Sequence, residues 1–161
     1  MSNLILLISF VLDILLSNLF PYMRENLSLF TPLIVPITIY LIYPYYKDNK
    51  MKYLVLTIII GVIYDLLMTN LLFFDGVLFF IIGIITIYIN KNIKKTYISN
   101  IITIILIIII YELLEALFFA IFNIISIDIY EIIYYITHSL LLNIIYAVII
   151  YSIQKTTYEL I

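Results

Sequence analysis

Long apolar runs, separated by short polar segments, make up almost the whole chain. A helix that crosses a bilayer needs about 20 mainly apolar residues, with a range of roughly 17–25. Against that length, the sequence predicts six transmembrane helices joined by short loops. They cover residues 4–20, 29–45, 53–69, 77–89, 97–122 and 132–153. We therefore predict one all-α integral membrane domain over residues 1–161, with the first apolar run retained as a membrane span.

Prolines, glycines and polar residues suggest where these helices begin, bend and end. Pro32 suits the first turn of the second helix, where a missing N–H does no harm. Pro36 lies further inside and predicts a kink. Residues 70–75 predict a turn between the third and fourth helices. If this turn is tight, the fourth helix extends back to residue 71. Gly76 helps to start the fourth helix. Residues 154–155 begin a short polar tail.

Composition supports a membrane protein. The chain is 66% hydrophobic and 11% charged, whereas soluble domains are typically about 45–50% apolar and about 25% charged. There is no cysteine and only one histidine, which excludes disulfides, thiolate metal sites and histidine-rich metal sites. No basic patch with interleaved aromatic residues suggests binding to nucleic acid. We predict no cofactor.

Charge predicts the orientation. With six spans, most basic residues fall on one side of the membrane, and Arg24 stands alone among acidic residues on the other. Cytoplasmic loops attract lysine and arginine, so both termini are expected in the cytoplasm. The basic residues on that side are Lys47, Lys50, Lys52, Lys91, Lys94, Lys95 and Lys155. The acidic residues near the opposite side are Glu25, Asp75, Asp128 and Glu131.

A carboxylate interrupts the third apolar run at Asp65. An ionised aspartate near the centre of a bilayer helix costs about 2.5–3.5 kcal/mol on insertion scales. Gly61 lies four residues earlier and so shares its helix face. Because glycine lets a neighbouring backbone come close, this face is expected to meet another helix or to line a polar cavity.

Four further polar residues are expected at a similar depth: Asp13, Glu112, Glu115 and His138. We expect one polar cluster, or a cavity open to the outside, among the first, third, fifth and sixth helices. Three interpretations remain open. The cluster forms hydrogen bonds between helices, it contacts a partner's transmembrane helix, or it lines a ligand or proton pathway.

Enzymatic chemistry is not predicted. Glu112 and Glu115 are three residues apart on one helix but lack the histidine companions of a metalloprotease motif. The sequence also lacks a serine nucleophile motif and a phosphate-binding loop.

The chain resembles the MreD family of bacterial rod shape-determining membrane proteins. The resemblance is strongest over residues 53–88, where a glycine-containing span ends in Tyr64-Asp65-Leu66-Leu67 and is followed by a turn and an apolar helix. Thr31-Pro32 resembles the proline-containing start of the family's second span. Asn143 in the last span resembles a family asparagine.

The resemblance implies a non-catalytic role in cell elongation and cell-shape maintenance. The implied partners are an MreC-like membrane protein, a RodA-type glycosyltransferase and a penicillin-binding transpeptidase, with an indirect link to MreB filaments. The implied location is the bacterial cytoplasmic (inner) membrane. Gly61 and Asp65 become candidates for structural or partner contacts, and replacing Asp65 by leucine is expected to weaken assembly without preventing insertion.

The family is also similar in fold to the substrate-binding subunits of energy-coupling-factor vitamin transporters, which supplies an alternative function. A small lipid or ion transporter is a third possibility. The scaffold function needs a groove that accepts a partner's helix, whereas the transporter function needs an enclosed cavity. Small residues suited to such a groove are Gly61, Gly83, Ala116 and Ala120.

Overall fold

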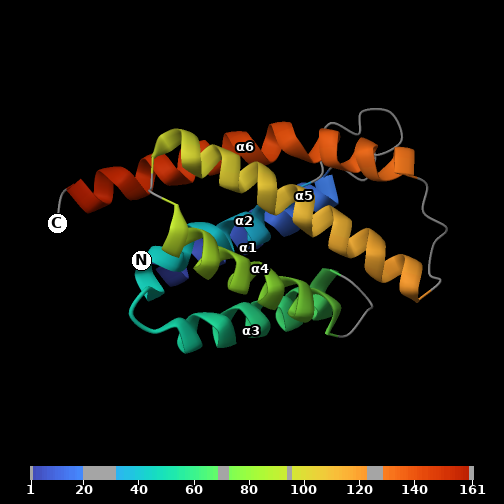
Figure 1. Ribbon diagram of the computed structural model, residues 1–161, viewed down its shortest axis with the longest axis horizontal. Helices are drawn as coiled ribbons and strands as arrows, with labels where there is room; N and C mark the ends of the chain where they lie inside the picture. Colours follow the sequence, from blue (N-terminus) through green and yellow to red (C-terminus); the bar gives the residue numbers. More distant parts are fainter. Residues whose placement is uncertain (1, 20–31, 69–72, 94–95, 123–128, 160–161) are drawn as a thin grey trace.

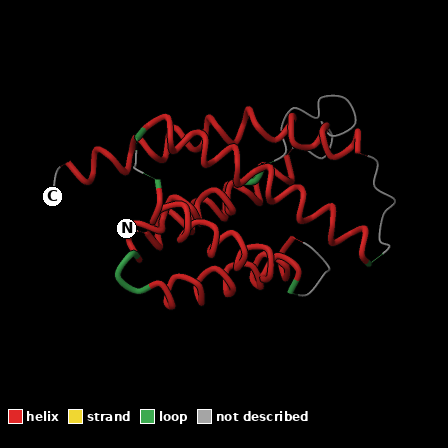
Figure 2. Tube along the Cα trace, in the orientation of Figure 1, coloured by secondary structure: helices red, strands yellow, loops and turns green. Residues whose placement is uncertain are grey.

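The computed structural model describes residues 2–19, 32–68, 73–93, 96–122 and 129–159, and every regular element in these ranges is a helix. Helix accounts for nearly all of the described trace (Figure 2). The α-helices are α1 (Ser2–Leu19), α2 (Ile34–Ile42), α3 (Lys50–Met68), α4 (Phe74–Asn92), α5 (Tyr97–Ile121) and α6 (Ile129–Glu159). A short 3-10 helix, η2 (Tyr43–Tyr46), continues α2. The predicted all-α fold is confirmed.

The helices pack mainly as consecutive pairs around α2. α1 packs with α2, α3 with α4, and α5 with α6, while α2 also contacts α4, α5 and α6. In Figure 1, α3 and α4 form one edge and α6 the other, with α1 and α2 between them. Every residue of α2 is buried. A helix that is apolar all round is expected in such a central position.

Apolar side chains also cover the outside of the bundle. On α1, the inward face carries Ile5, Ser9 and Asp13, whereas large aliphatic side chains are exposed on the other face. Soluble proteins rarely expose apolar patches of this extent. Within the described residues, three helical segments are long and apolar enough to cross a membrane, and they cover residues 74–92, 97–121 and 132–153. Shorter apolar helical segments cover residues 3–17 and 34–46.

The start of α2 corrects the predicted kink at Pro36. The helix begins at Ile34, so Pro36 is its third residue and Pro32 lies before it. The first four N–H groups of a helix have no partner within the helix. The missing N–H of Pro36 therefore removes no helical hydrogen bond, and no kink is needed.

Two other predicted boundaries are wrong. α4 begins at Phe74, so Asp75 belongs to the helix and not to the preceding turn. α6 continues to Glu159, so the segment predicted as a polar tail at residues 154–155 is helical. Parts of the predicted loops, including Arg24, Glu25, Lys94, Lys95 and Asp128, lie outside the described residues.

Glycines let α3 and α4 come close together. A Cβ atom built on Gly61 would lie 2.4 Å from the carbonyl oxygen of Asp75 and 2.5 Å from the Cα of Gly76. A Cβ on Gly83 would meet the side chains of Thr57 and Leu54 at 3.1 and 3.2 Å. The close helix contact expected at Gly61 forms within this chain, and because the chain fills the space beside Gly61 and Gly83, neither glycine is available to a partner's helix.

Candidate functional site

Asp65 caps the N-terminus of α4. Its carboxylate, 1% exposed, accepts hydrogen bonds from the backbone N–H of Asp75 at 2.9 Å and of Gly76 at 3.3 Å. Phe73, the residue that precedes α4, provides no side-chain cap and has a left-handed backbone with φ of 66°. Because a helix N-terminus has unpaired donors and a partial positive charge, α3 provides through Asp65 the acceptor that α4 lacks.

Asp13 and Asn143 cap the N-terminus of α2 in the same way. Asp13 Oδ2 accepts from the N–H of Val35 at 3.1 Å, and Asn143 Oδ1 accepts from the N–H of Leu33 at 2.8 Å. The Nδ2 of Asn143 donates to the carbonyl oxygen of Ser139 at 2.6 Å. Both capping side chains are fully buried. Side chains of α1 and α6 therefore each provide one acceptor for the start of α2, whereas Asp65 alone provides both acceptors for the start of α4.

Asp75 lies where α3, α4 and α5 meet. It is fully buried, and its Oδ1 accepts a hydrogen bond from the hydroxyl of Tyr111 at 2.9 Å. Asp65 and Glu115 are close enough to act on its charge. Asp75 in turn acts on the charge of Asp13. Asp75 therefore lies near two other carboxyl groups, those of Asp65 and Glu115.

The sequence pattern predicts that Asp75 lies in the outer turn, and this prediction misses the position of Asp75 near Asp65 and Glu115. The available signal was its position immediately before Gly76, between apolar residues on both sides. That pattern fits both a polar turn and a buried helix start. The contact of Gly61 with the Asp75–Gly76 backbone decides between them, and it is a tertiary feature.

The other predicted cluster residues lie in different settings. Glu112 is buried on α5. The Nδ1 of His138 lies 2.6 Å from the carbonyl oxygen of Tyr134, and the two rings pack with centroids 3.8 Å apart. His138 is thus engaged by its own helix, whereas Asp65 and Glu115 lie close enough to Asp75 to act on its charge.

Further buried hydrogen bonds tie α2 to its neighbours. The hydroxyls of Thr38 and Tyr146 lie 2.6 Å apart, which joins α2 to α6. Tyr40 donates to Asn100 of α5 at 2.6 Å. The hydroxyl of Tyr53 on α3 donates to a carbonyl oxygen of α2 at 2.9 Å. In a bilayer, polar groups must find partners within the protein, so these bonds help to fix the position of α2.

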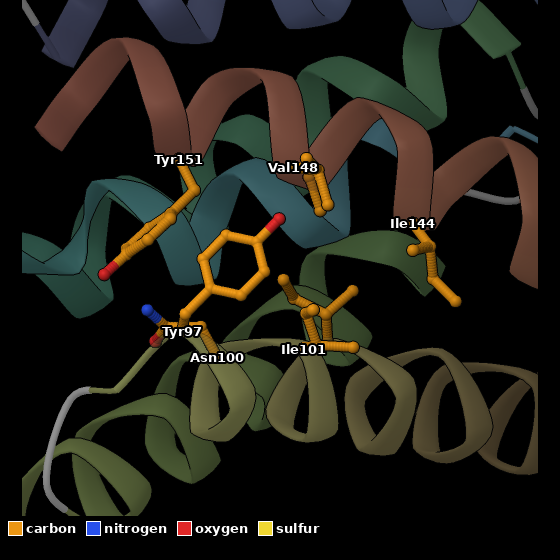
Figure 3. Close-up of a pocket in the computed structure, with 8 residues that line it drawn as sticks. Tyr97, Asn100, Ile101, Ile144, Val148 and Tyr151 are labelled. Atoms are coloured by element: carbon orange, nitrogen blue, oxygen red, sulfur yellow. The ribbon is translucent and has the colours of Figure 1, made fainter. Parts of the chain in front are cut away.

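A small hollow lies between α5 and α6 (Figure 3). Its volume is about 10 Å³, which is roughly room for one water molecule. Tyr97 and Tyr151 face each other across it, with ring centroids 5.8 Å apart. The lining residues are Tyr97, Asn100, Ile101, Ile104, Ile144, Ala147, Val148 and Tyr151. This hollow is too small for a vitamin and does not include the carboxylates.

The carboxylates of Asp13 and Asp65 are engaged by backbone N–H groups, so their evident chemistry is to stabilise helix starts. Within the described part of the chain, no group of three histidine, cysteine, aspartate or glutamate side chains is arranged to hold a metal ion. Hydrogen bonds of buried polar side chains therefore connect the helices inside a bundle that is otherwise apolar.

The family model described as rod shape-determining protein MreD matches residues 1–158. The chain belongs to the MreD family. The match covers nearly the whole sequence, and it confirms the resemblance drawn from the Tyr64–Leu67 region. Together with the apolar helices, it establishes a rod shape-determining membrane protein. Comparison with curated proteins and with solved structures gives no match.

Proposed function

We propose that this protein is a non-catalytic membrane component of the cell-elongation machinery. It binds an MreC-like membrane protein and supports peptidoglycan synthesis by a RodA-type glycosyltransferase and a penicillin-binding transpeptidase, with MreB filaments linked on the cytoplasmic side. The observation that carries this proposal is the family match over residues 1–158. The use of the buried carboxylates as helix caps supports a structural role for them.

The proposed topology has six spans in the inner membrane and both termini in the cytoplasm. The exposed Lys50 and Lys52 lie at the start of α3, and the exposed Lys91 lies at the end of α4. These lysines therefore lie at one end of the α3–α4 hairpin, as the cytoplasmic preference of basic residues requires. A single cysteine placed at Lys50 should react with a membrane-impermeant reagent only from the cytoplasmic side, and reaction from outside would reverse the orientation.

The proposed partner surface is the C-terminal half of α5. Gly61 and Gly83 are occupied by the α3–α4 contact. Of the small residues that suit close helix packing, Ala116 and Ala120 remain, four residues apart, and Ala120 is exposed. Small residues at this spacing let a second transmembrane helix approach closely. We assign the MreC-like protein's transmembrane helix to this surface.

Co-purification from the native membrane tests both the function and the surface. The tagged protein should recover an MreC-like protein together with the elongation synthases. Ala120→Phe should lower that recovery at least about tenfold, the effect of about 1.4 kcal/mol in binding. Ile102→Phe is the matched control, because Ile102 is exposed near the other end of the same helix, and it should leave recovery unchanged.

Other outcomes would redirect the assignment. Recovery of a transporter's membrane coupling subunit with paired ATPases would replace the scaffold function by the vitamin-transporter alternative. Full recovery of the MreC-like protein with Ala120→Phe would keep the function but move the partner surface away from α5.

A further inference from the structure

Asn100 uses only one half of its side-chain amide within the described part of the chain. Its Oδ1 accepts a hydrogen bond from the hydroxyl of Tyr40 at 2.6 Å. Its Nδ2 is buried and, among the residues that the structure describes, has no hydrogen-bond partner. The residue is only 5% exposed. Buried donors without a partner are rare because they give up their hydrogen bonds to water, so this N–H group is suited to bind an acceptor from outside the chain.

Asn100 lines the hollow between α5 and α6, which has a polar end and an apolar end (Figure 3). The residues at the polar end are Tyr97, Asn100 and Tyr151. Those at the apolar end are Ile101, Ile144 and Val148. The volume of about 10 Å³ admits one oxygen-sized group beside the amide. The hollow therefore suits a ligand that brings a single acceptor atom and continues as hydrocarbon.

The polar end of the hollow lies where a bilayer changes from headgroups to hydrocarbon. α5 has 25 residues, so at 1.5 Å per residue it is about 37 Å long and exceeds the hydrocarbon core of about 30 Å by a few ångströms at each end. Asn100 is the fourth residue of this helix. Tyrosines are enriched at the interface, and Tyr97, which is 48% exposed, starts the helix there. The ester groups of glycerophospholipids lie at this level.

An ester carbonyl fits the hollow better than a water molecule does. A buried water molecule needs two to four polar partners. Of the eight lining residues, five are aliphatic, and Tyr97 and Tyr151 present their rings to each other. A carbonyl oxygen is an acceptor only, so the single N–H donor of Asn100 is enough for it. The acyl chain can then continue over the exposed aliphatic side chains outside the bundle.

We propose that the hollow between α5 and α6 is a phospholipid-binding site, in which Asn100 Nδ2 donates a hydrogen bond to an ester carbonyl oxygen of a diacyl glycerophospholipid. Tyr97 and Tyr151 flank the ester group, and the aliphatic lining contacts the first methylene groups of the chain. The site lies near the N-terminus of α5, whereas the proposed partner surface is on its C-terminal half. The proposal therefore goes beyond the proposed function and does not depend on it.

Competition between an ester lipid and an ether lipid tests the proposal. The full chain is placed in nanodiscs that contain equal amounts of a diester phosphatidylglycerol and its diether analogue, which has the same headgroup and chain length but no carbonyl oxygen. Native mass spectrometry after release from the nanodiscs measures which lipid stays bound. The wild type should retain the ester lipid about three- to tenfold more than the ether lipid, as expected for one hydrogen bond.

Two variants should remove this preference by different means. Asn100→Leu removes the donor at a similar side-chain size, and Val148→Phe fills the hollow from α6 while leaving the amide unchanged. Two controls should keep the preference. Tyr40→Phe removes the other hydrogen bond of Asn100, and Ile149→Phe adds the same ring at an exposed position of α6 that does not line the hollow.

The wild-type measurement alone can overturn the proposal, even where a variant does not fold. Equal retention of the two lipids would show that no ester carbonyl is bound, and it would assign the Asn100 donor to an ordered water molecule. A preference that persists in folded Asn100→Leu would overturn the proposal as well, because the ester would then be bound by another donor. A preference that persists in folded Val148→Phe would place the ester outside the hollow.

Discussion

The α1–α2 and α3–α4 pairs both provide hydrogen-bond acceptors for the N-terminus of their second helix, but from different parts of the chain. In both, a carboxylate on the first helix caps the N-terminus of the second, Asp13 for α2 and Asp65 for α4. Asp65 binds two N–H groups only 10 and 11 residues further along the chain. Asp13 binds one N–H group 22 residues away, and Asn143 provides the second acceptor from 110 residues away.

This difference indicates how independent each pair is. The α3–α4 pair contains its own cap and its own close backbone contact at Gly61. The α1–α2 pair depends on α6 to complete the cap of α2. A membrane offers no water to satisfy a helix start, so α2 can be fully satisfied only once α6 has packed against it. We infer that α3–α4 is the more self-sufficient unit.

The largest expected effect is at Gly61. Gly61→Ala places a Cβ against the backbone of Asp75 and Gly76 at 2.4–2.6 Å. Backbone atoms cannot rotate away, so the two helices must separate, and we expect a loss of about 3 kcal/mol or more in the free energy of unfolding. The loss is measured by heating the purified protein in detergent and recording the fraction that remains monodisperse at each temperature.

Gly83→Ala is the control for this prediction. Its Cβ would meet only side-chain atoms of Thr57 and Leu54, at 3.1–3.2 Å, and side chains can shift. We expect a loss of less than about 1 kcal/mol, because this substitution also restores helix propensity. Equal losses for the two variants would show that the backbone contact at Gly61 is no more sensitive to an added Cβ than the side-chain contact at Gly83.

A smaller effect separates the two caps. Asp65→Leu leaves two backbone donors of α4 without an acceptor and should cost about 2–4 kcal/mol. Asp13→Leu leaves one backbone N–H donor of α2 without an acceptor, but it also removes an unpartnered acceptor oxygen. It should therefore lower the free energy of unfolding by only about 1–2 kcal/mol. Chemical unfolding of both variants in the same detergent gives the comparison.

Asparagine variants sharpen this test. Asp65→Asn replaces one of its two acceptor oxygens by an NH2 donor, whereas Asp13→Asn can keep the one acceptor that it uses. We expect Asp13→Asn to be close to wild type and Asp65→Asn to be less stable. A greater loss at Asp13 than at Asp65 would contradict the view that α3–α4 carries the fuller cap.

The positions of the helices could be predicted from the sequence more reliably than the contacts among the buried polar side chains. Five of the six predicted spans overlap their helices closely, because apolar run length is read directly from the chain. The predicted start of the second span at residue 29 is earlier than the observed start of α2 at Ile34, because Pro32 and Pro36 both suit positions in a helix. Depth along the helices predicts that Asp13, Asp65 and Glu115 lie at a similar level. The place of Asp75 near Asp65 and Glu115 depends on the azimuth of each helix, which the sequence does not encode locally.

The sequence by itself determined the helical, membrane-embedded class of this protein and its family, because composition and apolar run length are local properties. Only the tertiary structure decided which backbone donors each buried carboxylate would meet. Asp65 and Asp13 look alike in the sequence, each a lone carboxylate in an apolar run. Their difference arises because hydrogen-bond partners are set by the packing of helices that are far apart in the chain.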